Sequence, residues 1–87
     1  MPKSVLIVDD SKSVRTATCR FVESQNGLEV CGEAVDGLDA VEKALQLGPD
    51  LIILDLAMPR MNGLEAAHEL RAMFVCVPII LFSMFGD

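Results

Sequence analysis

Three aspartates stand directly after two runs of apolar residues. Asp9 and Asp10 follow Val5–Val8, and Asp55 follows Leu51–Leu54. Such runs are typical of strands buried on both faces of a parallel sheet, whose carboxyl ends meet at one edge. We therefore expect the three carboxylates to gather at that edge. Gathered carboxylates repel one another unless a proton or a cation intervenes, and oxygen ligands of this kind suit Mg²⁺. A carboxylate beside Mg²⁺ is then a candidate nucleophile toward phosphorus.

The rest of the chain supplies further strands and helices in alternation. The mixed run Leu28–Ala34 predicts a strand nearer the sheet edge, and Pro78 introduces a fourth expected strand, Ile79–Phe82. Between the strands, apolar residues recur at helical spacing. The expected stripes are Val14, Ala17, Phe21 and Val22; Leu38, Val41, Ala44 and Leu45; and Leu64, Ala67, Leu70 and Phe74. This alternation predicts one α/β domain over residues 1–87, a doubly wound parallel sheet with helices on both faces.

Polar residues and glycines mark the expected helix ends. Asp10 or Ser11 is suited to cap the first helix, and Asn26-Gly27 is expected to stop it. Asp36 is expected to cap the second helix, and Gly48-Pro49 to end it.

Charge argues against a nucleic-acid partner. The formal net charge is −6, and the chain has only seven lysines and arginines, which are scattered. The small group Lys12, Arg15 and Arg20 is most simply a solvated helix face. No apolar run approaches the roughly 18 residues that a membrane span needs, and the first residues lead straight into a strand, so we expect a cytoplasmic protein.

The cysteines and the single histidine do not suggest a metal site. Cys19, Cys31 and Cys76 are far apart and show no zinc-type spacing, so we expect buried free thiols. His68 lies off the apolar stripe of its expected helix and is interpreted as a solvated histidine.

Five segments of the chain match one family pattern, in order and over essentially all 87 residues. They are Val5–Asp10, Asp36-Gly37, Pro49–Asp55, Asp55–Gly63 and Pro78–Ser83. On these segments the chain resembles the receiver domain of two-component response regulators. The resemblance implies a flavodoxin-like fold with strand order 2-1-3-4.

The resemblance also implies roles for the site residues. Asp55 would be the phosphoacceptor, receiving its phosphoryl group from a histidine kinase or a phosphotransfer protein. Asp9 and Asp10, with Asp55 and the backbone carbonyl of Ala57, would hold Mg²⁺. Ser83 would contact the phosphoryl group. The implied function is that of a signalling domain rather than an enzyme.

The chain departs from the family pattern at its carboxyl end. The family continues for two more helices and a fifth strand, which normally bears a lysine at the site. This chain stops at Asp87, and its only lysines are Lys3, Lys12 and Lys43. We therefore expect a truncated receiver with the fifth strand and last two helices missing, and impaired phosphorylation of Asp55.

Two alternatives to this truncated receiver stay open. In the first, the chain is a non-enzymatic, self-associating interaction module with a vestigial phosphorylation site. On either interpretation, receiver or module, we expect a homodimer through the region Ile79–Phe85, because an unpaired strand edge is a template for pairing. In the second, the chain is a fragment of a longer regulator.

Overall fold

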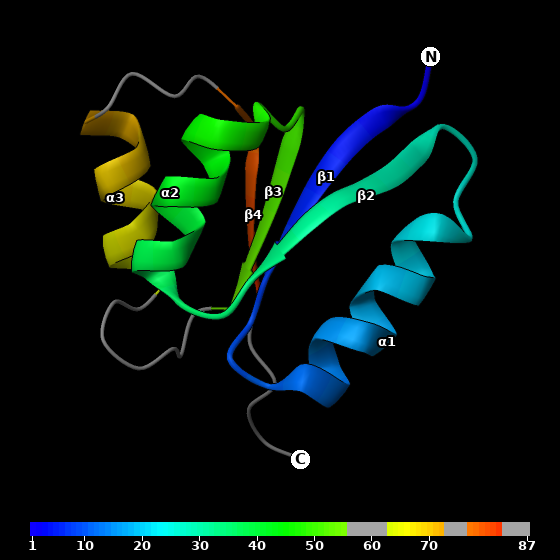
Figure 1. Cartoon of the computed structure of the whole chain (residues 1–87), viewed down its shortest axis with the longest axis horizontal. Coiled ribbons are helices and arrows are strands. Elements are labelled where there is room, and N and C mark those ends of the chain that lie inside the picture. Colours follow the sequence, from blue (N-terminus) through cyan, green and yellow to red (C-terminus); the bar gives the residue numbers. More distant parts are fainter. Residues whose placement is uncertain (56–62, 73–76, 83–87) are drawn as a thin grey trace.

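The computed structural model describes residues 1–55, 63–72 and 77–82. Within these residues four strands alternate with three helices, as the sequence predicts (Figure 1). The strands are β1 (Lys3–Val8), β2 (Leu28–Ala34), β3 (Leu51–Asp55) and β4 (Ile79–Phe82). The helices are α1 (Lys12–Glu23), α2 (Gly37–Leu47) and α3 (Gly63–Ala72). All strand pairs are parallel and the order is β2-β1-β3-β4, which confirms the expected flavodoxin-like arrangement.

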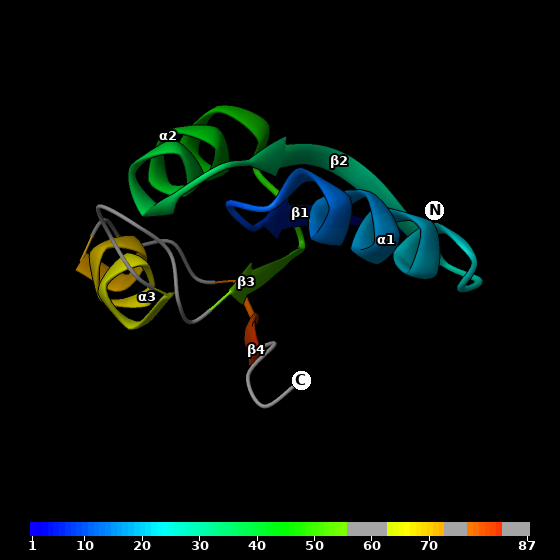
Figure 2. The ribbon, with the colours of Figure 1, turned by 90° about the horizontal axis from the view of Figure 1, so that it is seen from below.

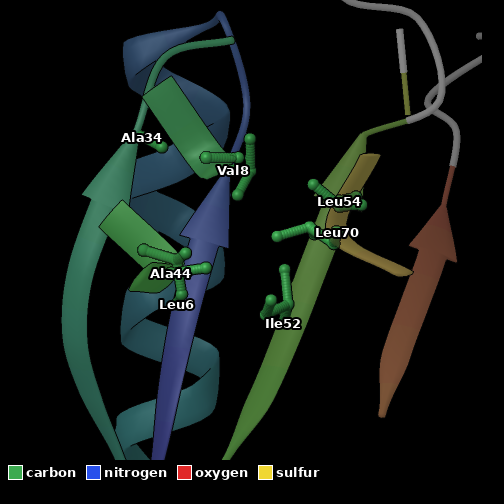
Figure 3. Packing of buried hydrophobic residues seen from close by; sticks show 8 residues of the cluster. Leu6, Val8, Ala34, Ala44, Ile52, Leu54 and Leu70 are labelled. Carbon is green, nitrogen blue, oxygen red and sulfur yellow. The ribbon is translucent and has the colours of Figure 1, made fainter. Parts of the chain in front are cut away.

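Helices cover both faces of the sheet. Figure 2 shows α2 and α3 together on one face and α1 on the other. The larger apolar cluster lies between the sheet and α2 and α3, where Leu6, Ile52 and Leu70 are fully buried (Figure 3). A smaller cluster under α1 joins Val5, Ile7 and Val22. The fully buried run Val5–Val8 of β1 and the partly buried run Leu51–Leu54 of β3 thus form the platform behind the strand ends.

The helix ends follow simple capping chemistry, with one correction. The hydroxyl of Ser11 accepts a bond from the amide of Val14, so Ser11 rather than Asp10 caps α1. The carboxylate of Asp36 accepts from the amide of Asp39 at 2.9 Å, and Gly48 ends α2 in the left-handed conformation (φ 59°). The prediction that Asn26-Gly27 stops α1 was wrong, because the helix ends earlier at the Ser24 cap. Gly27 (φ 86°) lies in the turn into β2.

The buried stripes of α1 and α2 differ from those expected. Val22 and Ala44 are buried as expected, and Val41 packs against the core. In contrast, Phe21, Leu38 and Leu45 are half or more exposed, and Ala40, which was not expected in the stripe, is buried. The face of α2 that meets the core therefore runs through Ala40 and Ala44, and Leu38 and Leu45 lie at its solvent-facing flanks. In α3 the prediction holds where it is described: Leu70 is buried, Ala67 packs against the core, and His68 is exposed. Phe74 lies outside the described residues.

Two further features of the sheet are a hydrogen-bonded aspartate and a bulge. Asp50 links the amino ends of β1 and β3, because its carboxylate accepts hydrogen bonds from the amide and hydroxyl of Ser4. β2 contains a bulge: Val5 pairs with Val30 and Leu6 with Gly32, so Cys31 is an extra residue.

Cys19 and Cys31 are half-buried free thiols, and burial raises the pKa of each. Cys76 falls outside the described ranges. In the described part of the chain, no helix is long and apolar enough to cross a bilayer.

Candidate acidic site at the carboxyl ends of the strands

The three aspartates that follow β1 and end β3 meet at one edge of the sheet. One carboxylate oxygen from each of Asp9, Asp10 and Asp55 lies within 4.8 Å of the others. β1 and β3 run parallel and side by side, with Val8 opposite Leu54, which brings their last residues together. The expected convergence of the three carboxylates is therefore observed.

Burial differs sharply among the three acids. Asp9 is 1% exposed and Asp55 8% exposed, whereas Asp10 faces solvent. A buried carboxylate loses most of its hydration, and neighbouring negative charges add to the cost of ionisation. The pKa of Asp9 is accordingly raised, mainly by burial and further by the charges of Asp55 and Asp10, against the lowering effect of a bond from the Ser11 amide.

The two oxygens of Asp9 have different environments. Oδ1 accepts a hydrogen bond from the amide of Ser11 at 2.9 Å. Oδ2 is buried and has no hydrogen-bond partner within the part of the chain that the structure describes. A buried acceptor without a partner is costly, and in native proteins such an atom usually indicates an ion or a water. The donor set of carboxylate oxygens fits a hard divalent cation.

Capping does not account for the cluster. Ser11 performs that role for α1, and Asp36, the remaining buried acid among the described residues, is explained by its cap of α2. Helix capping therefore does not explain why Asp9 and Asp55 are buried side by side, an arrangement that costs Coulombic repulsion.

Two of the expected site residues cannot be placed. Ala57 and Ser83 lie outside the described residues, so their expected roles stay predictions. Asp55 itself ends β3 and is paired in register with Phe82 of β4.

Sequence reasoning missed one residue beside the site. Arg15 was expected on a solvated face, but its side chain is only 13% exposed. Its guanidinium donates to the main-chain oxygen of Asp9 and to the carboxylate of Glu33, each at 3.0 Å. The spacing of Asp9 and Arg15 in the sequence does not predict these two contacts. The contact with Glu33 depends on the pairing of β1 with β2, which a local pattern does not show.

Known proteins resemble this chain in sequence and fold. The family model described as response regulator receiver domain matches residues 5–87. A protein-glutamate methylesterase/protein-glutamine glutaminase of Clostridium acetobutylicum is 40% identical over 83 residues, 95% of this chain and 24% of that protein. The response regulator protein VraR of Staphylococcus saprophyticus is 36% identical over 85 residues, 98% of this chain and 41% of that protein.

A solved structure agrees with these matches. The response regulator domain of Thermotoga maritima CheB superposes with a TM-score of 0.91 at 38% identity, covering 100% of this chain and 64% of that one. The chain spans about a quarter and about two-fifths of the lengths of the two curated relatives above. The shared region includes the strands that carry all three aspartates.

Proposed function

This chain belongs to the response regulator receiver family, and on that premise we propose that it receives a phosphoryl group on Asp55 with the help of Mg²⁺. The observation that supports the proposal most strongly is the acid cluster itself. Three carboxylates lie within 4.8 Å, and the Oδ2 atom of Asp9 is buried without a partner among the described residues.

Asp9, Asp10 and Asp55 would hold the cation, together with the main-chain carbonyl of Ala57. Bound Mg²⁺ supplies positive charge that offsets negative charge on phosphoryl oxygens. Asp9 is the fixed ligand of the set, because one of its oxygens is held by Ser11. Asp10, which is exposed, is the ligand that remains accessible from solvent.

Asp55 is the nucleophile in this proposal. One of its carboxylate oxygens forms a bond to phosphorus while the bond between phosphorus and the donor breaks, and the donor leaves with that electron pair. Asp55 ends β3 and belongs to the sheet, so its position is set by the strand rather than by a loop. Ser83 is proposed to contact the transferred group. The donor would be a histidine kinase or a phosphotransfer protein.

Magnesium titration followed by amide NMR shifts tests the cation site. We expect shifts at Asp9, Asp10 and Asp55 at millimolar Mg²⁺, and their loss in Asp9→Asn. Asp50→Asn is the matched control, because it removes a strand-flanking carboxylate from the opposite edge of the sheet. If wild-type amides at the acid cluster do not respond to millimolar Mg²⁺, the proposed site is wrong.

We also propose that the 87-residue polypeptide alone accepts the phosphoryl group slowly. Of its three lysines, Lys3 begins β1 at the far end of the strand, Lys12 is exposed at the first residue of α1, and Lys43 is bonded to the main-chain oxygen of Glu33 and to Asp39. In the family pattern, a lysine on the fifth strand contacts the phosphoryl group. Without that charge-assisted contact the barrier to phosphorylation rises by about 1.5–3 kcal/mol, which corresponds to roughly ten- to a hundredfold in rate. Uptake from a small acyl phosphate as fast as in the Thermotoga maritima CheB receiver, measured by intact mass, would contradict this.

The second candidate function is self-association through β4. Ile80 is 50% exposed and Leu81 37% exposed, and β4 pairs with β3 along one side. An open strand edge with apolar side chains favours pairing with a second copy. Sedimentation equilibrium should then report twice the chain mass, and Ile80→Lys should restore a monomer. Leu45→Lys on α2, an equally exposed position, is the control; a wild-type monomer at tens of micromolar rules this candidate out.

A cytoplasmic location is part of the proposal. The half-buried thiols of Cys19 and Cys31 are free, which suits a reducing compartment. Fractionation of cells that express the protein, probed for this chain, tests the location.

A further inference from the structure

Arg15 connects three elements next to the acid cluster. It lies on α1, and its guanidinium reaches the main-chain oxygen of Asp9 beyond β1 and the carboxylate of Glu33 on β2. Arginine is suited to this geometry because its donors form a rigid fork. With only 13% of its side chain exposed, Arg15 is held in place rather than sampling solvent.

Asp9 is fixed at three of its four polar groups. Its amide donates to the oxygen of Ala34 at 3.1 Å, its carbonyl accepts from Arg15 at 3.0 Å, and its Oδ1 accepts from Ser11 at 2.9 Å. Only Oδ2 is left without a hydrogen bond among the described residues. The backbone of Asp9 is thereby held from both sides, and the side chain has one oxygen available to a ligand.

The bulge at Cys31 places the side chain of Glu33 on the side of the sheet that faces α1 and Arg15. Before the bulge, Leu28 and Val30 pack under α1, whereas Ala34 after it packs in the cluster beneath α2. One extra residue therefore reverses the alternation of β2 and turns Glu33 to the α1 side. Lys43 fixes the same segment from α2, since its ammonium donates to the main-chain oxygen of Glu33 at 2.8 Å.

We propose that Arg15 is a positioning residue, which clamps the backbone of Asp9 so that its carboxylate is set for a divalent cation before the cation arrives. Glu33 orients Arg15 for this task. The identity of the cation as Mg²⁺ rests on the proposed function, whereas the clamp itself is a property of the metal-free chain. Arg15 acts through its hydrogen bond to the Asp9 carbonyl and not merely as a nearby positive charge.

Two measurements test the clamp. The first is the Mg²⁺ dissociation constant, from NMR titration at a temperature well below unfolding. Loss of a group that supports a metal ligand typically weakens binding 10- to 100-fold, and we expect about tenfold for Arg15→Met. The second is amide hydrogen exchange of Ser11 without metal. This amide donates to Asp9 Oδ1, so loosening the turn should speed its exchange.

Matched variants separate position from charge. Arg20→Met removes the same charge from an exposed position on the same helix and should leave both measurements unchanged. Glu33→Gln keeps a side-chain oxygen for Arg15 and should remain close to wild type, whereas Glu33→Ala should move both measurements in the direction of Arg15→Met. Arg15→Lys, which keeps the charge but lacks the fork, should fall between wild type and Arg15→Met.

The outcomes distinguish this inference from the proposed function. If Arg15→Met lowers thermal stability but leaves both the Mg²⁺ affinity and Ser11 exchange at wild-type values, the clamp is refuted. If Arg20→Met weakens Mg²⁺ binding as much as Arg15→Met does, the effect is one of charge and the inference also fails. If the wild-type chain binds no Mg²⁺, the proposed function fails, and the exchange of Ser11 alone decides whether the clamp exists. Should Arg15→Met not fold, Arg15→Lys and Glu33→Ala decide the same question.

Discussion

Replacing Asp9 with asparagine should stabilise the metal-free protein while removing its response to Mg²⁺. Asp9 is buried beside two other carboxylates, and its Oδ2 has no partner in the described structure. Asparagine has nearly the same shape, retains an oxygen for the Ser11 amide, and offers an NH₂ group to a neighbouring carboxylate. The substitution therefore turns a repulsive contact into a hydrogen bond.

The size of the effect follows from the distances. The carboxylate oxygens lie within 4.8 Å of one another. At that upper limit two unit charges repel by about 1 kcal/mol in water and by about 3.5 kcal/mol at an effective dielectric constant of about 20. Asp10 is exposed, so its repulsion with Asp9 is near the lower value. Asp55 is buried, so its repulsion with Asp9 lies between the two values. Allowing for relaxation, we expect Asp9→Asn to raise the free energy of unfolding by about 1–2 kcal/mol. For a domain of this size that is about 5–15 °C in Tm.

The same site gives the pH dependence a definite sign. Burial and the two neighbouring charges raise the pKa of Asp9 in the folded protein. Between its unfolded and folded pKa the native state binds the extra proton, so stability falls as pH rises through this window. Above the folded pKa, Asp9 is ionised in both states, and the full cost of burying its charge beside two other carboxylates is present. Asp9→Asn should lose this decline, and the two proteins should approach each other in stability at acid pH.

Thermal unfolding with and without Mg²⁺ is the assay. The wild type should gain about 1.4 kcal/mol when Mg²⁺ reaches ten times its dissociation constant, whereas Asp9→Asn should gain nothing. A metal-free Asp9→Asn protein that is less stable than wild type at neutral pH would refute the account of Asp9 as a buried acid that its neighbouring carboxylates destabilise.

Three further predictions concern the scaffold. Ile52→Ala, at a fully buried position in the core beneath α2 and α3, should cost about 2–5 kcal/mol in urea unfolding; a loss below 1 kcal/mol would contradict the packing described. Gly48→Ala should cost roughly 1–2 kcal/mol, because Gly48 is left-handed at φ 59°; an unchanged Tm would contradict that conformation. The bonds from the Ser4 amide and hydroxyl lower the pKa of Asp50, so its contribution is present above its unfolded pKa and is lost as pH falls through the folded value. Asp50→Asn should therefore lose less stability than wild type as the pH is lowered, measured as Tm against pH. A loss as large as in wild type would exclude a stabilising role for the Asp50 carboxylate.

The apolar runs were sufficient to predict the sheet and the place of the acids. Val5–Val8 is fully buried, and Leu51–Leu54 alternates buried with partly buried residues, which fits strands covered by helices on both faces. Aspartates that follow two neighbouring parallel strands must meet at one edge, and Asp9 and Asp55 do. The strand order itself was expected from the family resemblance, because spacing alone does not say which strands are neighbours.

The features that periodicity missed depend on register and on helix rotation. Arg15 contacts Glu33 because a bulge at Cys31 turns Glu33 toward α1, and no local pattern in β2 predicts an extra residue. Leu45 is exposed because α2 packs on the core through the expected Ala44 and through Ala40, which the stripe did not include. A hydrophobic stripe indicates a helix, but which edge of the stripe faces the sheet is decided by the sizes of facing side chains.

Phosphoryl uptake at Asp55 tests the central claim most directly. The wild-type chain, Asp55→Asn and the control Asp50→Asn would be incubated with an acyl phosphate, with Mg²⁺ or with excess chelator, and followed by intact mass. We predict a gain of one phosphoryl group in wild type and in Asp50→Asn that requires Mg²⁺ and is abolished in Asp55→Asn. Uptake that persists in Asp55→Asn or under chelation, or no uptake by the wild type after prolonged incubation with Mg²⁺, would contradict the assignment of Asp55 as the acceptor.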